Sequence, residues 1–395
     1  KINLNNNDIL IPQIVALKKI EKYLVSGKLN TKNTNLKKDE INRIISDDFI
    51  KLDIQKILFS SKNNFNFEIN KNFKVNNLDI KSDIDLDNFE FKNFLLLKNI
   101  FPNIRNNLIF RNQKLKLEYK NKDLNIIGKG ETLLQRKIDQ IEYEIYKENN
   151  KIEFKKKLKI SKNSFNLDFL NYKKLKNSDL ELNFEGQSNV QGKLVLDKIS
   201  LTEKNNIIFI QNLILSKNFN IYDLEKVDIN YLDKDNLKNN LELIKKNGNY
   251  LISGNSFNIK SIIDKLLNSD NDEQLKVFDK DFKIIFDVEN IYLDTENIIR
   301  ELKGFLTLNK SEILELNLES KFSNEEKIKF TIKKNGNEKV TTLYSYKAKP
   351  FVDRYKFIKG FEEGDLNFYS IKKNGISNST LKIDNFKIQE IPALA

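Results

Sequence analysis

The chain has 395 residues, 39% of them hydrophobic and 31% charged, and carries a formal net charge of +12. It contains no histidine and no cysteine, which excludes Ser-His triads, thiolate nucleophiles, disulfide frameworks and zinc sites of the usual ligand types. We therefore expect no enzymatic activity, no cofactor and no metal site. Lysine supplies most of the positive charge without forming a basic arm, so we also expect no nucleic-acid partner.

The first stretch, residues 1–60, is predicted to form a helical N-terminal segment. Pro12 is suited to the first turn of a helix whose apolar residues recur about every 3.6 positions. These residues are Leu10, Ile14, Leu17, Ile20 and Leu24. A second helix is indicated by Ile41, Ile44, Ile45 and Phe49. A third, short helix is expected over residues 93–100, just before Pro102.

Apolar and polar residues then alternate from Phe65 to Ile388, which predicts β-strands with one apolar face and one charged face. The expected fold class is mainly β: an elongated, curled antiparallel sheet with a few short capping helices. A first section of this sheet is expected over residues 61–250. A C-terminal module, with a helix at 256–267 followed by hairpins, is expected over residues 251–395.

Three copies of Lys-Lys-Asn-Gly, at residues 245–248, 333–336 and 372–375, lie between alternating stretches. Asn-Gly suits the positive φ angles of a two-residue type I′ turn. We therefore expect three tight hairpins, with the central positions occupied by Asn247-Gly248, Asn335-Gly336 and Asn374-Gly375.

Two helices are expected to interrupt the sheet. In the first, over residues 256–267, Ser256 or Asn258 is available as N-cap, and the apolar stripe consists of Ile259, Ile262, Ile263, Leu266 and Leu267. The second contains Phe351, Tyr355 and Ile358. For both helices, closing the end of a sheet core is favoured over a binding role.

Two short motifs resemble ligand sites. Asp83, Asp85 and Asp87 lie on one strand face, but the glycine and the late glutamate of a calcium loop are missing, which favours a solvated strand face. Gly128-Lys-Gly130 is too short to hold a phosphate and indicates a β-bulge or a close approach of the backbone.

The C-terminal part of the chain resembles a known family. The stretch from Pro350 to Phe368 contains Gly-Phe-Glu-Glu-Gly-Asp-Leu, and the stretch from Ser379 to Ala395 ends in Pro-Ala-Leu-Ala. Both look like the C-terminal module of AsmA-like proteins of the YhdP type, which are related to TamB. Residues 248–267 are similar to the strand, glycine and helix junction of that family.

This resemblance implies a periplasmic segment of a longer protein, held at the inner membrane by a missing N-terminal anchor, in a Gram-negative bacterium with an AT-rich genome. In that family a curled sheet is understood to present a hydrophobic groove, along which phospholipids pass to the outer membrane during outer-membrane biogenesis. The implied partners are phospholipid acyl chains, the inner membrane, and outer-membrane or periplasmic proteins.

The candidate groove residues are apolar side chains at alternate positions of the expected strands: Leu115, Leu117, Tyr119, Leu180, Leu182, Phe184, Leu314, Leu316, Leu318, Ile328, Phe330, Ile332, Leu366, Phe368, Leu381 and Ile383. The sequence leaves open whether they face a groove or fill a closed core. The alternative function is a β-rich structural or adhesive scaffold that has a closed core and binds other proteins along its edges.

Overall fold

The computed structural model describes residues 2–4, 7–44, 53–92, 97–149, 151–188, 193–216, 220–261, 280–309, 312–355 and 361–388. Within these residues strands far outnumber helices, so the predicted mainly β, antiparallel fold class is confirmed. The chain divides into two compact units: unit 1 contains Lys1–Leu167 and Lys173–Lys204, and unit 2 contains Asp168–Tyr172 and Asn205–Ala395. These units do not coincide with the sections expected over residues 61–250 and 251–395.

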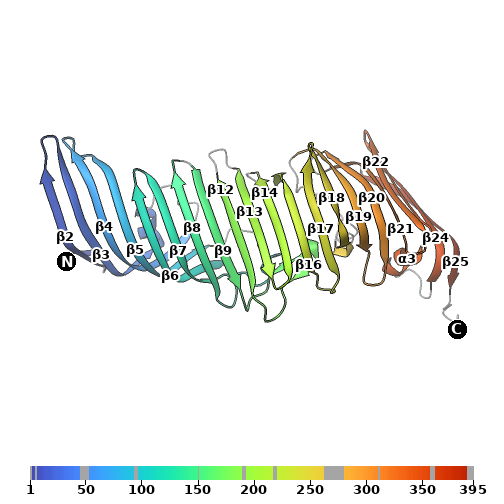
Figure 1. The fold of residues 1–395 in the computed structure, drawn as a ribbon, viewed down its shortest axis with the longest axis horizontal. Coiled ribbons are helices and arrows are strands. Elements are labelled where there is room, and N and C mark those ends of the chain that lie inside the picture. Colours follow the sequence, from blue (N-terminus) through green and yellow to red (C-terminus); the bar gives the residue numbers. More distant parts are fainter. Residues whose placement is uncertain are drawn as a thin grey trace. The chain divides into compact units, whose positions relative to one another are not determined.

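The main strands of unit 1 are β1 (Ile2–Leu4), β2 (Asn7–Lys18), β3 (Lys22–Lys37), β4 (Ile54–Asn70), β5 (Val75–Lys92), β6 (Asn107–Lys120), β7 (Asp123–Leu133), β8 (Asp139–Glu148), β9 (Lys151–Ile160), β12 (Leu180–Ser188) and β13 (Leu194–Glu203). Each described pair is antiparallel, and strands follow one another in chain order from β1 to β9 and then to β12 and β13 (Figure 1). Between β9 and β12 lie β10 (Asn166–Leu167), the 3-10 turn η1 (Asp168–Leu170) and β11 (Tyr172–Lys173).

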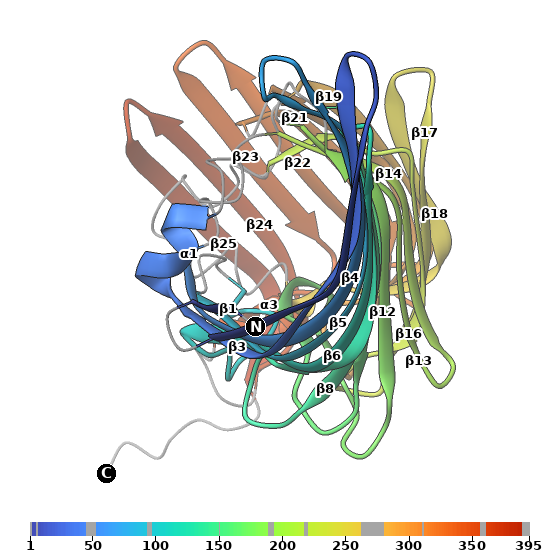
Figure 2. The same ribbon diagram turned by 90° about the vertical axis from the view of Figure 1, so that its left-hand side faces the viewer.

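Bulges shape the longest strands of unit 1. Asn33, Asn77 and Asn112 adopt positive φ where the register of β3, β5 and β6 shifts against a neighbouring strand. Asparagine tolerates this left-handed conformation, and a bulge bends the strand that carries it. Figure 2 shows β3 to β6 curving along their length, with α1 (Lys38–Ile44) on the inner side of the curve.

The strands of unit 2 are β14 (Asn206–Leu215), β15 (Ile221–Asp223), β16 (Lys226–Leu232), β17 (Lys238–Lys246), β18 (Asn249–Asn258), β19 (Phe282–Tyr292), β20 (Ile298–Asn309), β21 (Glu312–Lys321), β22 (Lys327–Asn335), β23 (Glu338–Ser345), β24 (Phe361–Lys373) and β25 (Ile376–Ile388). β14 pairs with both β15 and β16, and from β16 onward each strand pairs with the next. The pair β18–β19 is parallel.

The helix predicted over Leu10–Leu24 is wrong. These residues form β2, a turn and β3, and the turn is closed by a hydrogen bond from the backbone N–H of Lys19 to the carbonyl of Lys22 (2.7 Å). Pro12 lies at a register shift of β2, not in a helical turn. The segment 1–60 is therefore mostly β-structure, and its described helix is α1, which contains Ile41 and Ile44. Ile45 and Phe49 lie outside the described residues.

Two of the three predicted hairpin turns are confirmed. Asn247-Gly248 joins β17 to β18 and Asn374-Gly375 joins β24 to β25, and all four residues have positive φ. The turn predicted at Asn335-Gly336 is wrong by one residue. Asn335 is the last residue of β22 and pairs with Glu338 of β23, so the central positions belong to Gly336 and residue 337.

The other predicted helices are only partly described. Asn258 Oδ1 accepts a hydrogen bond from the backbone N–H of Lys260 (3.0 Å), as expected for an N-cap, and Lys260 and Ser261 are helical. Ser256 belongs to β18, and the rest of the predicted 256–267 helix lies outside the described residues. Residues 98–100 form a turn, and the helix α3 covers Lys349–Tyr355. Residues 93–96 and Ile358 lie outside the described residues.

Candidate functional site

The groove candidates of unit 1 share one face of its sheet. Direct partners on neighbouring strands point to the same side of a sheet, as do alternate residues along one strand. A row of successive direct partners starts at Leu115 on β6. It continues through Gly128 on β7, Tyr143 on β8, Lys156 on β9 and Phe184 on β12. The predicted residues on this side, the apolar face of unit 1, are Leu115, Leu117, Tyr119, Leu180, Leu182 and Phe184.

A longer row of direct partners crosses unit 2. From β14 to β25 it contains Ile210, Val227, Leu243, Ile252, Phe286, Gly304, Leu318, Phe330, Leu343, Phe368 and Leu381. No residue of this row is charged. The predicted residues on this side, the apolar face of unit 2, are Leu316, Leu318, Ile328, Phe330, Ile332, Leu366, Phe368, Leu381 and Ile383. Leu314 is the extra residue at a register shift of β21, between Ile313, the partner of Leu308, and Glu315, the partner of Thr307. Sequence reasoning missed the row from Ile210 to Phe286, because strand alternation there is interrupted by apolar residues on both faces.

The apolar face of unit 2 is closed at one end. Ala348 lies just before α3 and Val352 lies within it. Both form a buried cluster with Phe361 and Leu366. The predicted groove residues Phe368 and Ile383 pack against this cluster. The helix α3 thus closes the end of a sheet core, as expected from the sequence. Leu366 is a buried member of that local core, whereas Phe368 and Ile383 are partly buried against it.

Elsewhere the two faces are less covered. Leu115, Leu117 and Tyr119 are half-buried, as are Leu318 and Phe330, and Leu381 is 50% exposed. Leu180 and Leu182, in contrast, are buried at the end of unit 1 where β9 and β12 meet the connection between them. The structure therefore brings the candidates onto common faces, but only some of them are accessible.

An aromatic ring fills the gap that a glycine leaves on the apolar face of unit 1. A Cβ atom placed on Gly128 would lie 2.5 Å from the Tyr143 ring and 2.6 Å from Leu115 Cδ2. The missing side chain lets both groups lie against the backbone of β7. A Cβ on Gly130 would lie 2.6 Å from the carbonyl oxygen of Asn112, at the bulge of β6. The close approach predicted for Gly128-Lys-Gly130 is confirmed.

The opposite faces carry cross-strand ion pairs. In unit 1 Lys157 Nζ lies 2.9 Å from a carboxylate oxygen of Glu181, and in unit 2 Lys329 Nζ lies 2.6 Å from Glu319. Asp83 is exposed and lies opposite Lys62 on β4 and Lys116 on β6 in the strand register, consistent with the solvated face predicted there. Among the described residues no group of three or more acidic side chains is suited to hold a metal ion. Such exposed pairs stabilise the sheet weakly and keep this face polar.

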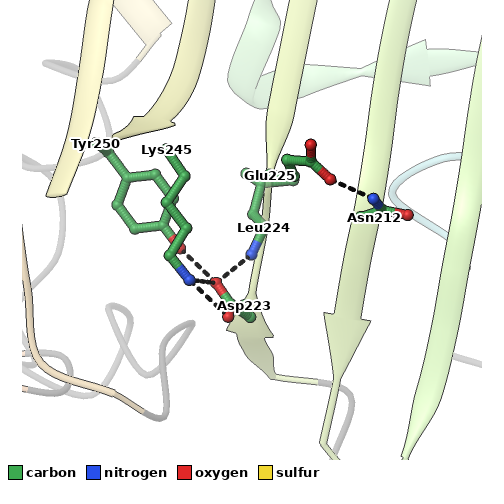
Figure 3. A network of polar contacts seen from close by, with 6 residues as sticks. All are labelled: Asn212, Asp223, Leu224, Glu225, Lys245 and Tyr250. Atoms are coloured by element: carbon green, nitrogen blue, oxygen red, sulfur yellow. Dashed lines mark hydrogen bonds and ion pairs between the residues drawn. The ribbon is translucent and has the colours of Figure 1, made fainter. Parts of the chain in front are cut away.

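A pocket of about 190 Å³ lies at one end of β17, β18 and β19 in unit 2. At its edge the Asp223 carboxylate accepts hydrogen bonds from Lys245 Nζ (2.6 and 2.7 Å), the Leu224 N–H (2.9 Å) and the Tyr250 hydroxyl (3.1 Å) (Figure 3). Burial acts to raise the pKa of Asp223, but these bonds, led by that from Lys245, hold it below its ordinary value. Burial, with a contribution from Asp223, raises the pKa of Tyr250 to about 12. This network ties β15 to the β17–β18 hairpin.

A buried polar cluster closes one end of the apolar face of unit 1. Asp139 is 2% exposed, and its Oδ2 accepts a hydrogen bond from Asn163 Nδ2 (2.7 Å). Burial raises the pKa of Asp139 to about 6. Glu203, on the same face, is buried and accepts hydrogen bonds from the Ser178 hydroxyl and the Leu175 N–H. The sequence gives no signal for this cluster, since its members are distant in the chain.

None of the helices in the described part of the chain is long and apolar enough to cross a membrane. No protein-family model, curated protein or solved structure matches the chain.

Proposed function

We propose that the apolar faces of the two units hold lipid acyl chains, and that the protein is a passive conduit for phospholipid transport from the inner to the outer membrane. The observation that carries the proposal is the uncharged row from Ile210 to Leu381 in unit 2, which includes half-buried and exposed side chains. Each CH₂ group that leaves a bilayer for water costs about 0.8 kcal/mol. A continuous apolar face lowers that cost without covalent chemistry.

The arrangement of the two faces supports this proposal. Because the cross-strand ion pairs Lys157–Glu181 and Lys329–Glu319 lie on the opposite side of each sheet, acyl chains have one favourable side on which to lie. In unit 1 the inner side of the curved strands holds α1 (Figure 2), whose Ile41 is 2% exposed. An apolar inner side agrees with the burial of this residue. Curvature toward an apolar face increases the number of side chains that surround a bound chain.

The resemblance to AsmA-like proteins of the YhdP type supplies the cellular setting of the proposal. The chain would act in the periplasm, with the full-length protein anchored in the inner membrane and outer-membrane or periplasmic proteins as further partners. Neither an enzymatic reaction nor a cofactor is needed for this role.

One observation favours the alternative scaffold. Within the described residues β1 pairs only with residues 7–9 of β2, so the rest of β2 has one unpaired edge. Large apolar side chains on both faces of β2 are exposed there, namely Leu10, Ile11, Ile14, Val15 and Leu17. An apolar unpaired strand is suited to pair with another chain. The scaffold would use this edge and would need no lipid.

Native mass spectrometry of the protein purified from membranes separates the two functions. A conduit is expected to carry bound phospholipid, which appears as adducts of the corresponding mass and is released on activation in the gas phase. Protein that arrives free of lipid, while still folded and bound to a protein partner, would favour the scaffold.

A further inference from the structure

Lys156 is a charged residue in the middle of the apolar face of unit 1. Its direct partners are Tyr143 on β8 and Phe184 on β12. The remaining neighbours on this face, along β9 and diagonally on β8 and β12, are also uncharged: Phe154, Leu158, Ile141, Ile145, Leu182 and Gly186. The other charged side chains of β8, β9 and β12 on this face are Asp139 and Lys147, which lie at its two ends.

Lys156 differs from its neighbours on the same strand. Lys155 and Lys157 point to the charged face, where Lys157 pairs with Glu181 at 2.9 Å. Among the described residues no carboxylate lies within ion-pair distance of Lys156, and its Nζ lies 5.2 Å from the centroid of the Phe154 ring. The side chain is accessible to solvent, yet the protein atoms around it lower the pKa of Lys156 through desolvation.

We infer that Lys156 binds the phosphate of a phospholipid whose acyl chains lie along the apolar face of unit 1. An ammonium group in partly desolvated, apolar surroundings lacks a counter-ion, and an anionic head group supplies one. Phe154 and Phe184 flank it and offer apolar contact to the first carbons of the chains. The inference rests on the proposed conduit and adds a place where a lipid pauses with its head group fixed.

The charge of Lys156 can be removed without changing the apolar character of the face. Lys156→Met replaces the ammonium by an uncharged side chain of similar length, and Lys156→Arg retains the positive charge. Lys155→Met is the matched control, because it removes one lysine from the same strand on the opposite face. Urea unfolding of each variant establishes that it is folded before binding is measured.

The experiment measures binding of dodecyl phosphate, dodecyl maltoside and inorganic phosphate by isothermal titration calorimetry, with the detergents below micelle formation. We expect Lys156→Met to weaken dodecyl phosphate binding at least about tenfold, equivalent to about 1.4 kcal/mol. Binding of dodecyl maltoside should not change, Lys156→Arg and Lys155→Met should bind like the parent protein, and inorganic phosphate alone should bind far more weakly.

Unchanged binding of dodecyl phosphate by Lys156→Met would overturn the inference, as would an equal loss for Lys155→Met or for the maltoside. If the maltoside and the phosphate bind equally well to all variants, the role of Lys156 fails while the apolar conduit stands. If neither amphiphile binds the parent protein, the conduit fails as well.

Discussion

Leu316 and Ile332 are direct partners on β21 and β22, and each is only 7% exposed, although both lie on the apolar face of unit 2. Phe330, one position along the same face, pairs with Leu318 and is half-buried. Two neighbouring positions on one face thus differ in their access to water. This difference separates side chains that support the sheet from side chains that can meet a ligand.

The first prediction follows from this difference. Leu316→Asp should lower the free energy of unfolding by about 3 kcal/mol or more, because the carboxylate would be buried without a partner. Phe330→Asp should cost clearly less, since its carboxylate can remain hydrated, and Phe330→Leu should cost less than about 1.5 kcal/mol. Urea unfolding of the three variants measures this order. Equal losses for the two aspartate variants would show that Phe330 belongs to a closed core.

The second prediction concerns the hairpins. Asn247 has a φ of 51°, whereas Asn335 ends a strand without positive φ. Asn247→Ala should therefore destabilise by about 1 kcal/mol, the cost of placing a residue with an ordinary Cβ in the left-handed region. Asn335→Ala should have a much smaller effect. The midpoints of urea unfolding compare the two, and the reverse order would contradict the turn assignment.

The third prediction tests the contact of Tyr143 with Gly128. Gly128→Ala should cost about 1–3 kcal/mol, because the new methyl group overlaps the Tyr143 ring and Leu115. The double variant Gly128→Ala/Tyr143→Ala should lose less stability than the sum of the losses of the two single variants, since the ring that clashes with the new methyl group has been removed. A double-mutant cycle by chemical unfolding measures this coupling. Strictly additive losses would argue against the contact.

The fourth prediction is a pH dependence. The pKa of Asp139 is raised by burial from 3.8 to about 6, so its contribution to stability is fully present below pH 3.8 and is lost as the pH rises through 6. The parent protein should therefore lose about 3 kcal/mol between pH 3.5 and pH 7 relative to Asp139→Asn, which cannot ionise. Urea unfolding at several pH values tests this. Parallel pH profiles for the two proteins would refute it.

Much of the β-structure from residue 65 onward could be predicted from alternation, because many of its strands have one apolar face; from Ile210 to Phe286 apolar residues on both faces interrupt the pattern. The same rule failed before it. β2 carries apolar residues on both faces, and a selection of them, Leu10, Ile14 and Leu17, matches helical spacing by chance. Pairing of β2 with β3 then decides the structure, as tertiary contacts override local pattern.

The sequence was sufficient to predict which candidate residues share a face of the sheet, but not which of them are exposed. Alternation places Leu366 and Phe368 on the apolar side correctly, yet only the structure shows that Leu366 is buried in the α3 cluster and that Phe368 packs against it. Lys156 was missed for a related reason. In a run of three lysines, at residues 155–157, the sequence does not indicate which one points to the apolar side, and cross-strand register settles this.

Site-specific photocrosslinking in cells tests the proposed conduit most directly. A photoreactive residue is placed at Leu117 and Phe330 on the apolar faces, and at Lys116 and Lys329 on the charged faces of the same strands. We expect phospholipid adducts at Leu117 and Phe330 and none at the two lysine positions. Adducts at all four positions, or at none of them in folded protein, would contradict the assignment of these faces to lipid.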